Sequence, residues 1–145
     1  MVEPDLCLTD IADVEGYRVV NDGLADHGRE QAGYWNSTPL YVLVRDPSNG
    51  TVLGGLTGRT SLGLLFIDLV FLPPELRNRG IGTRVLRMAE DEAIRRGCRA
   101  AVLYTITFQA PAFYERHGWR EFGRVACDPP GTARIFMTKD LAAGP

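Results

Sequence analysis

Hydrophobic and polar positions follow one another along the chain in short runs that predict both strands and helices. Apolar and β-branched residues dominate residues 40–46, 51–59 and 62–72, and turn-forming residues separate these runs, which predicts an antiparallel meander. The last run is apolar almost throughout, so we expect residues 64–72 to be buried on both faces of a sheet. A shorter apolar run predicts one more strand at residues 5–9.

Helical periodicity occurs in three other stretches. Residues 81–96 repeat apolar positions every three or four residues and end at a glycine, which predicts one amphipathic helix. Residues 13–33 have helical sequence that three glycines interrupt, so we expect two shorter helices there. Residues 110–118 carry proline near the start and glycine at the end, which indicates a short helix.

The order of these elements predicts the fold class. Three further strand-like runs follow, at residues 98–106, 119–126 and 133–141. The helix at residues 81–96 connects two strands as a βαβ unit, and the two strands of such a unit are parallel. We therefore expect an α/β fold with a mixed, mostly antiparallel sheet around one central parallel pair. A length of 145 residues suits a single domain, with a core over about residues 5–141.

Composition argues against several classes of protein. Hydrophobic residues make up 45% of the chain and charged residues 23%, as in globular domains, and no apolar run approaches the roughly 18 residues of a membrane span. The first residues lack the basic and apolar regions of a secretory signal, so we expect a cytoplasmic protein. A net charge of −2 argues against a dedicated nucleic-acid binder. The three cysteines lie far apart, which suggests neither a disulfide framework nor a metal site.

The stretch LRNRGIGTRVLRMAEDEA, residues 76–93, joins a basic, glycine-containing turn directly to the long helix. The first backbone N–H groups of a helix have no partner within it and attract anions. Gly80 and Gly82 leave this backbone open, and Arg77 and Arg79 add positive charge. The turn therefore suits phosphate, although an ordinary helix entry with solvated arginines has a similar sequence. It lacks both the GK[ST] of a Walker loop and the third glycine of a dinucleotide fingerprint.

The hexapeptide Arg77-Asn78-Arg79-Gly80-Ile81-Gly82 resembles the signature [QR]-x-x-G-x-[GA] of the GNAT superfamily of N-acetyltransferases. A second stretch, FQAPAFYERHGWREFG, resembles the family's short helix with a tyrosine before a Gly-aromatic step. The resemblance covers nearly the whole chain and implies acetyl-CoA as the co-substrate. The residues that it assigns to acetyl-CoA are Phe71, Leu72, Arg77, Asn78, Arg79, Gly80, Ile81, Gly82 and Thr83. Asn78 stands where relatives often have glycine, and asparagine tolerates positive φ.

The resemblance implies acetyl transfer by direct attack of an amine, without an acyl-enzyme. A main-chain N–H near Leu72 would donate to the thioester carbonyl, and Tyr114 would protonate the departing thiolate, because a phenol keeps its proton at neutral pH. Asp68 interrupts an apolar strand and is the leading candidate for the base. Simple packing of Tyr114, or a structural hydrogen bond from Asp68, explains the same residues. His27 and His117 are weaker candidates for the base.

The partner that we expect is a small-molecule amine. Residues 1–30 contain eight acidic residues and two arginines, which suits a cationic acceptor near Tyr34 and Trp35. Gln109 is a further candidate for contact with the acceptor. A solvated acidic surface explains the same charges. We expect no nucleic-acid or membrane partner, and the family implies a possible homodimer.

Three other functions stay open at the level of sequence. The chain could be a regulatory module that binds acetyl-CoA without turnover, or an acetyltransferase of protein N-termini or lysines, and both share these motifs. It could also be an interaction domain whose arginine-rich helix contacts RNA or protein. The absence of an aromatic stacking pattern argues against RNA.

Overall fold

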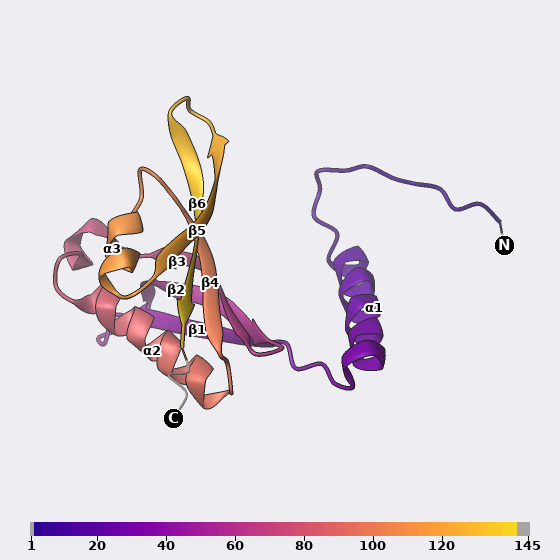
Figure 1. The fold of residues 1–145 in the computed structure, drawn as a ribbon, viewed down its shortest axis with the longest axis horizontal. Coiled ribbons are helices and arrows are strands. Elements are labelled where there is room, and N and C mark those ends of the chain that lie inside the picture. Colours follow the sequence, from indigo (N-terminus) through magenta and orange to yellow (C-terminus); the bar gives the residue numbers. More distant parts are fainter. Residues whose placement is uncertain (1, 142–145) are drawn as a thin grey trace. The chain divides into compact units, whose positions relative to one another are not determined.

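The computed structural model describes residues 2–141 and divides the chain into two units, with the boundary between Trp35 and Asn36. Figure 1 labels the helices and strands of both units. No helix among the described residues is long and apolar enough to cross a membrane.

The N-terminal unit contains one helix, α1 (Val14–Ala32), instead of the predicted two. Asp13 caps its start by accepting a hydrogen bond from a first-turn N–H at 2.7 Å, and Gly33 ends it at a φ of 84°. A glycine inside a helix costs only about 1 kcal/mol relative to alanine, so the interior glycines do not break a well-capped helix. One of them, Gly28, lies so close to the Trp35 ring that a Cβ would come within 2.3 Å of it.

The predicted strand at residues 5–9 is wrong, because this segment is exposed and has no strand structure. A short apolar run becomes a strand only where a neighbouring strand satisfies its backbone N–H and C=O groups. The six strands of the second unit pair only among themselves. A sequence pattern alone cannot supply that partner.

The second unit is built on a six-stranded sheet. Its strands lie in the order β1-β2-β3-β4-β6-β5, and of the five pairs only β3–β4 is parallel. The predicted mixed α/β fold with one central parallel pair is therefore confirmed. The elements of this unit are β1 (Thr38–Arg45), β2 (Val52–Ser61), β3 (Leu64–Phe71), the 3-10 turn η1 (Pro74–Leu76), α2 (Ile81–Arg95), β4 (Ala100–Ile106), α3 (Pro111–Arg116), β5 (Arg120–Cys127) and β6 (Thr132–Asp140).

The core of the second unit lies between the sheet and α2, which runs along one face of it (Figure 1). Ala89 of α2 is fully buried together with Leu65, Ala101 and Met137 from three strands of the sheet. The helix predicted from its apolar periodicity at residues 81–96 is therefore confirmed, and its periodic face is the buried one.

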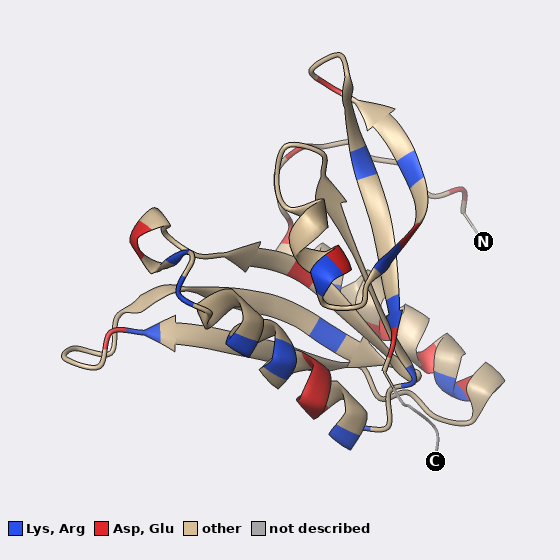
Figure 2. Ribbon diagram, turned by 60° about the vertical axis from the view of Figure 1, so that its left-hand side comes forward, with Lys and Arg blue, Asp and Glu red and all other residues tan. Residues whose placement is uncertain are grey.

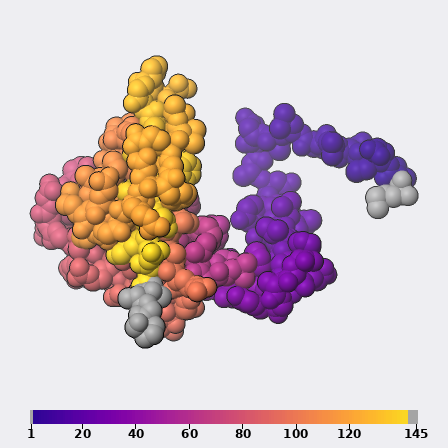
Figure 3. Space-filling view, in the orientation of Figure 1, coloured from indigo at the N-terminus to yellow at the C-terminus, as the bar shows by residue number. Residues whose placement is uncertain are grey.

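The opposite face of the sheet carries large side chains that are exposed or half-buried. Arg59 of β2 lies directly opposite Phe66 of β3, and Tyr104 of β4 lies directly opposite Phe136 of β6, so each pair shares a face. Within the second unit, up to residue 141, the helices α2 and α3 both have buried residues, and these residues are part of the core. The β5–β6 hairpin, orange and yellow in Figure 3, projects beyond the rest of this unit.

The strand β3 is buried over only half its length, which corrects the prediction for residues 64–72. Its residues are buried or half-buried up to Ile67 and exposed from Asp68 onward. The reason is that β3 pairs with β4 only as far as Phe66, opposite Val102. The register with β2 also shifts there, because Thr57 pairs with Leu69 and the next residue pairs with Ile67. Asp68 is therefore the extra residue of a β-bulge, a feature that often re-aims a side chain beside a functional site.

Candidate active site

The turn before α2 has the backbone that an anion site needs. Asn78 and Gly80 adopt positive φ angles of 59° and 77°, so the expected tolerance of Asn78 for this conformation is confirmed. The first hydrogen bond of α2 runs from the Arg84 N–H to the Gly80 carbonyl at 3.2 Å. The N–H groups of residues 81–83 therefore precede the first bonded N–H and have no partner within the helix. Basic residues lie along the turn and α2 (Figure 2).

The two arginines of the turn stabilise it and remain exposed. Arg77 Nε donates to the Leu72 carbonyl at 2.9 Å, and Arg79 Nη1 donates to the Glu75 carbonyl at 3.4 Å. Each guanidinium keeps further N–H donors for a ligand. A Cβ added at Gly80 would meet nothing within 4 Å, so the backbone there is open. These residues fit a diphosphate, which needs backbone donors, positive charge and close approach.

The helix α3 packs against the first turn of α2. A Cβ at Gly82 would lie 3.5 Å from the Phe113 ring, and Thr83 Oγ1 lies 3.1 Å from His117 Nε2. The Phe113 and His117 rings also meet edge to face, with centroids 4.8 Å apart. These contacts fix α3, and with it Tyr114, beside residues 77–83, which we call the anion-binding turn because their geometry fits an anion.

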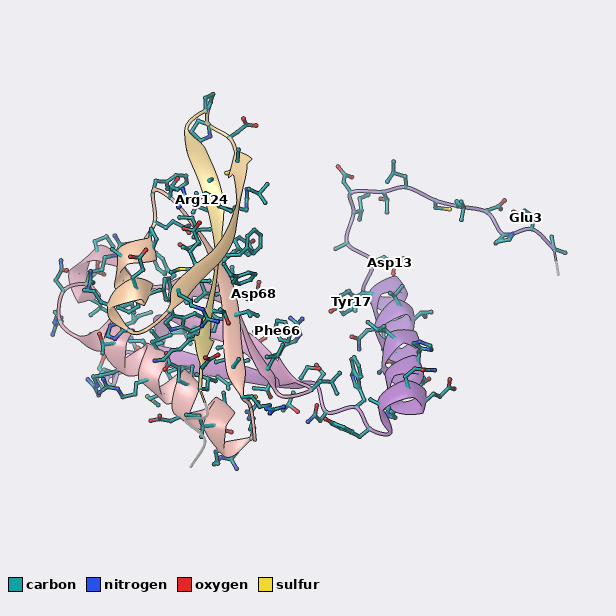
Figure 4. The ribbon with its side chains drawn as sticks, in the orientation of Figure 1. Glu3, Asp13, Tyr17, Phe66, Asp68 and Arg124 are labelled. Atoms are coloured by element: carbon teal, nitrogen blue, oxygen red, sulfur yellow. The ribbon has the colours of Figure 1, made fainter. Side chains whose placement is uncertain are left out.

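A cavity of about 170 Å³ opens where β3 and β4 part, and we call it the β3–β4 cavity. Both predicted catalytic residues line it, Asp68 from the bulge in β3 and Tyr114 from α3. Figure 4 labels Asp68 on β3. Gln109, the predicted acceptor contact, lines the same cavity, and its Oε1 accepts from the Ile106 N–H at 3.2 Å. Asp68 of β3 thus comes together with two residues from a segment some forty positions later in the chain, Gln109 and Tyr114.

Tyr114 is held in the core by its ring. Its side chain is 7% exposed and packs edge to face against Phe113 at 5.2 Å and Trp119 at 5.9 Å between centroids. Burial raises the pKa of this phenol above its ordinary value of 10. Tyr114 therefore carries its proton at neutral pH, which suits a proton donor and not a base.

A second cavity, of about 290 Å³, lies on the open face of the sheet, and we call it the aromatic cavity. It shares Asp68 and Tyr104 with the β3–β4 cavity, so the two cavities adjoin. Four aromatic rings line it, those of Phe66, Tyr104, Phe122 and Phe136. Sequence reasoning missed this cavity, because its residues come from five different strands and no two aromatic residues form a motif.

The remaining predicted site residues lie in two places. Phe71 is the last residue of β3 paired with β2, opposite Gly55, and Leu72 follows it directly. Both therefore precede the anion-binding turn, as the predicted thioester contact requires. Tyr34 and Trp35 belong to the N-terminal unit, where Tyr34 is 54% exposed and the Trp35 ring packs on α1. Their contact with an acceptor stays a prediction.

The model of the acetyltransferase (GNAT) family matches residues 9–119, which include the turn, α2 and the second motif as far as its Gly-aromatic step. The chain belongs to this family. The match spans most of the chain and extends from the N-terminal unit through α3 to Trp119. The protein is therefore an acyltransferase, and its family typically uses acetyl-CoA.

Known proteins resemble this GNAT protein over most of its length. The acetyltransferase Atu2258 of Agrobacterium fabrum is 36% identical over 132 residues, which cover 91% of this chain and 96% of the relative. The blasticidin-S acetyltransferase of Streptomyces morookaense is 34% identical over 103 residues, which cover 70% of this chain and 76% of the relative. A crystal structure of an acetyltransferase from Bacillus cereus has a TM-score of 0.72 and 27% identity, and the alignment covers 94% of this chain and 98% of that one.

A buried polar cluster of this GNAT protein also escaped the sequence analysis. Glu90 of α2 is 8% exposed and accepts from Lys139 Nζ at 2.6 Å and from Trp119 Nε1 at 3.2 Å. The cluster ties α2 to β6 and holds Trp119, whose ring packs against Tyr114. One signal was available, since Glu90 lies four residues after Leu86 and therefore on the buried face of the helix.

Proposed function

We propose that this protein transfers the acetyl group of acetyl-CoA directly to a primary amine of a small molecule. The observation that carries the proposal is that Asp68 and Tyr114, an acid and a phenol from different elements, line one cavity beside the anion-binding turn. The likeness to a blasticidin-S acetyltransferase supports a small-molecule acceptor.

The donor side of the site is made mainly of backbone. Acetyl-CoA supplies the acetyl group as a thioester, and its diphosphate suits the free N–H groups of residues 81–83 with Arg77 and Arg79. The backbone of Phe71 and Leu72 lies between this turn and the β3–β4 cavity. A main-chain N–H there can stabilise the negative charge that develops on the carbonyl oxygen during attack.

Asp68 and Tyr114, which both line the β3–β4 cavity, have different roles in the proton transfers. The carboxylate of Asp68 accepts a proton from the ammonium group of the acceptor, directly or through water, and so generates the nucleophilic amine. The amine nitrogen bonds to the acetyl carbon and the carbon–sulfur bond breaks. Tyr114 gives its proton to the departing thiolate, for which its raised pKa keeps it protonated. The nitrogen of the new amide loses its remaining excess proton to the phenolate, directly or through water, which restores Tyr114.

No cysteine is needed in this reaction. Cys98 is buried, and burial raises the pKa of its thiol, so it has little thiolate character. Cys7 lies in the N-terminal unit and Cys127 at the end of β5, and neither lines the β3–β4 cavity. Their positions support direct transfer over an acyl-cysteine route.

The proposal is tested by thiol release from acetyl-CoA against small amines, aminoglycoside and nucleoside antibiotics and peptide N-termini. We expect release that depends on a small amine, and Tyr114→Phe should lower kcat by about 100-fold or more, the usual range for a lost general acid. Tyr41→Phe is the matched control, because Tyr41 is an exposed tyrosine of β1 that lines neither cavity.

Each outcome separates the candidate functions. If acetyl-CoA raises the melting temperature but no amine gives turnover, the protein is a regulatory module and the proposal fails. If only peptide N-termini are acetylated, the acceptor is a protein. With Tyr114 as the acid, kcat should stay level as pH rises and fall only above about pH 10, because the phenol loses its proton above its raised pKa.

A further inference from the structure

The aromatic cavity has charged groups that the proposed reaction does not use. Arg59 lines it, with the guanidinium carbon 4.4 Å from the centroid of the Phe66 ring. Arg134 lines the adjoining β3–β4 cavity, 5.8 Å from the centroid of the Tyr104 ring. A guanidinium above an aromatic ring keeps donors at its edge for a carboxylate.

The charges of the two cavities do not balance. Asp68 is the only acidic residue among the described residues that line either cavity, and two arginines line these cavities with it. The hydrogen bonds and ion pairs found within residues 2–141 involve neither the Arg59 nor the Arg134 side chain. If Asp68 receives the ammonium group of the acceptor, both guanidiniums remain for an anion.

We propose that the acceptor is an amine that also carries a carboxylate or a similar anion, with a flat apolar group between the two charges. The inference rests on the proposed function and deepens it. The amine is held at Asp68, the flat group lies among the aromatic rings, and the anion binds Arg59. The acceptor is thus more than the simple cation that the acidic N-terminal segment indicates.

The strand geometry sets the spacing between the two charges. Arg59 pairs with Phe66, and Asp68 comes two residues later on β3 (Figure 4). Two residues of an extended strand span roughly 7 Å, and the β-bulge at Asp68 bends the strand, so the spacing is of this order or somewhat shorter. An amine and a carboxylate on the same carbon lie much closer together than that. One benzene ring between an aminomethyl group and a carboxylate gives a separation of this order.

Matched small molecules test the inference. The probes are para-(aminomethyl)benzoate, the corresponding benzamide and benzylamine, which share the amine and the ring and differ in the anion. In the wild type we expect kcat/KM for the acid to exceed that for the amide by about 10-fold or more, as charge-assisted bidentate bonding predicts. Arg59→Gln should bring the ratio of acid to amide close to one.

Two further arms make the test decisive. Arg45→Gln is the control, because Arg45 of β1 lines neither cavity and bonds the Gly50 carbonyl, so the acid-to-amide ratio should keep its wild-type value. Isothermal titration with the acetylated forms of the acid and the amide measures the same preference when turnover is slow.

The inference is overturned if wild type treats acid and amide alike in turnover and in binding, or if Arg59→Gln leaves their ratio unchanged. Equal treatment is also expected if protein, not ligand, covers the aromatic cavity. Turnover of other amines in the same assay would then show that the proposed function survives. Failure of acetyl-CoA to bind, with no turnover of any amine, would instead contradict the proposed function.

Discussion

The anion-binding turn and the aromatic cavity are built in opposite ways. The turn takes its free N–H groups and its two arginines from one continuous stretch, residues 77–83, and its shape depends on backbone conformation at Asn78 and Gly80. The aromatic cavity takes single side chains from five strands. The difference suggests that the turn recognises what all family members bind, whereas the cavity adapts to one acceptor.

The two regions should differ in their kinetic effects. A change in the turn should alter the KM of acetyl-CoA by the same factor for every acceptor. A change in the aromatic cavity should alter the KM of the acceptor and leave that of acetyl-CoA unchanged. Asp68 lines both cavities but not the turn. Its substitution should therefore slow the reaction with the acceptor strongly and leave the binding of acetyl-CoA unchanged.

Among substitutions that separate the two regions, the largest effect is expected for Asp68→Asn. Without its carboxylate the site cannot take the proton of an ammonium group, and we expect kcat/KM for benzylamine to fall by about 100-fold. Acetyl-CoA should stabilise the variant and the wild type against heat to the same extent. Asp140→Asn is the control, because Asp140 lies at the exposed end of β6. An equal loss for an amine that is already neutral at the assay pH would show that Asp68 is not the base.

A smaller effect is expected for Gly80→Ala in the turn. Gly80 has a φ of 77°, and an alanine there costs about 1 kcal/mol of strain or moves the backbone that we propose binds the anion. We expect the KM of acetyl-CoA to rise by about 10-fold. Gly50→Ala is a close control, because Gly50 has a φ of 75°, also has open space around its Cα, and lies in the β1–β2 turn. Equal effects of the two substitutions on the KM of acetyl-CoA would show that the turn does not bind acetyl-CoA.

The contrast between the two regions also explains which features could be predicted from the sequence. The turn and α2 were predicted because caps, glycines and apolar periodicity are local, and local signals decide a helix and its entry. Tyr114 and Asp68 were singled out separately, one by a motif and one by an acid in an apolar run. Their meeting in one cavity depends on the β3–β4 separation and the bulge, which no local pattern encodes.

The failures of prediction have physical reasons of the same kind. The single helix α1 continues through its glycines, and its caps at Asp13 and Gly33 offset part of their propensity cost. Glu90 looks like a surface residue in the run EDE, yet its partners Lys139 and Trp119 come from later in the chain. A buried charge becomes predictable only when its partner is known.

A modest effect is expected for Phe122→Ala in the aromatic cavity. Phe122 is 60% exposed, so its loss removes only part of a ring contact, and we expect the KM of an aromatic amine to rise by about fivefold. Val125→Ala on the same strand, also 60% exposed and outside the cavity, should have no such effect. Steady-state kinetics with benzylamine and with a small aliphatic amine check this, because only the aromatic acceptor should lose affinity. A rise in the KM of acetyl-CoA would instead show that the aromatic cavity contributes to the binding of acetyl-CoA.

The smallest effect is expected from the acidic face of α1. Replacing Asp22, Asp26 and Glu30 with the corresponding amides removes negative charge that is exposed and partly paired, since Asp26 accepts from Arg29 at 2.7 Å. If this face attracts a cationic acceptor, its KM should rise by about two- to threefold at low salt and return to the wild-type value as salt screens the charges. An acceptor that also carries an anion should respond less than a simple cation such as benzylamine. An unchanged KM for both at low salt would leave acceptor recognition to the aromatic cavity, where Arg59 and Asp68 set the charge pattern.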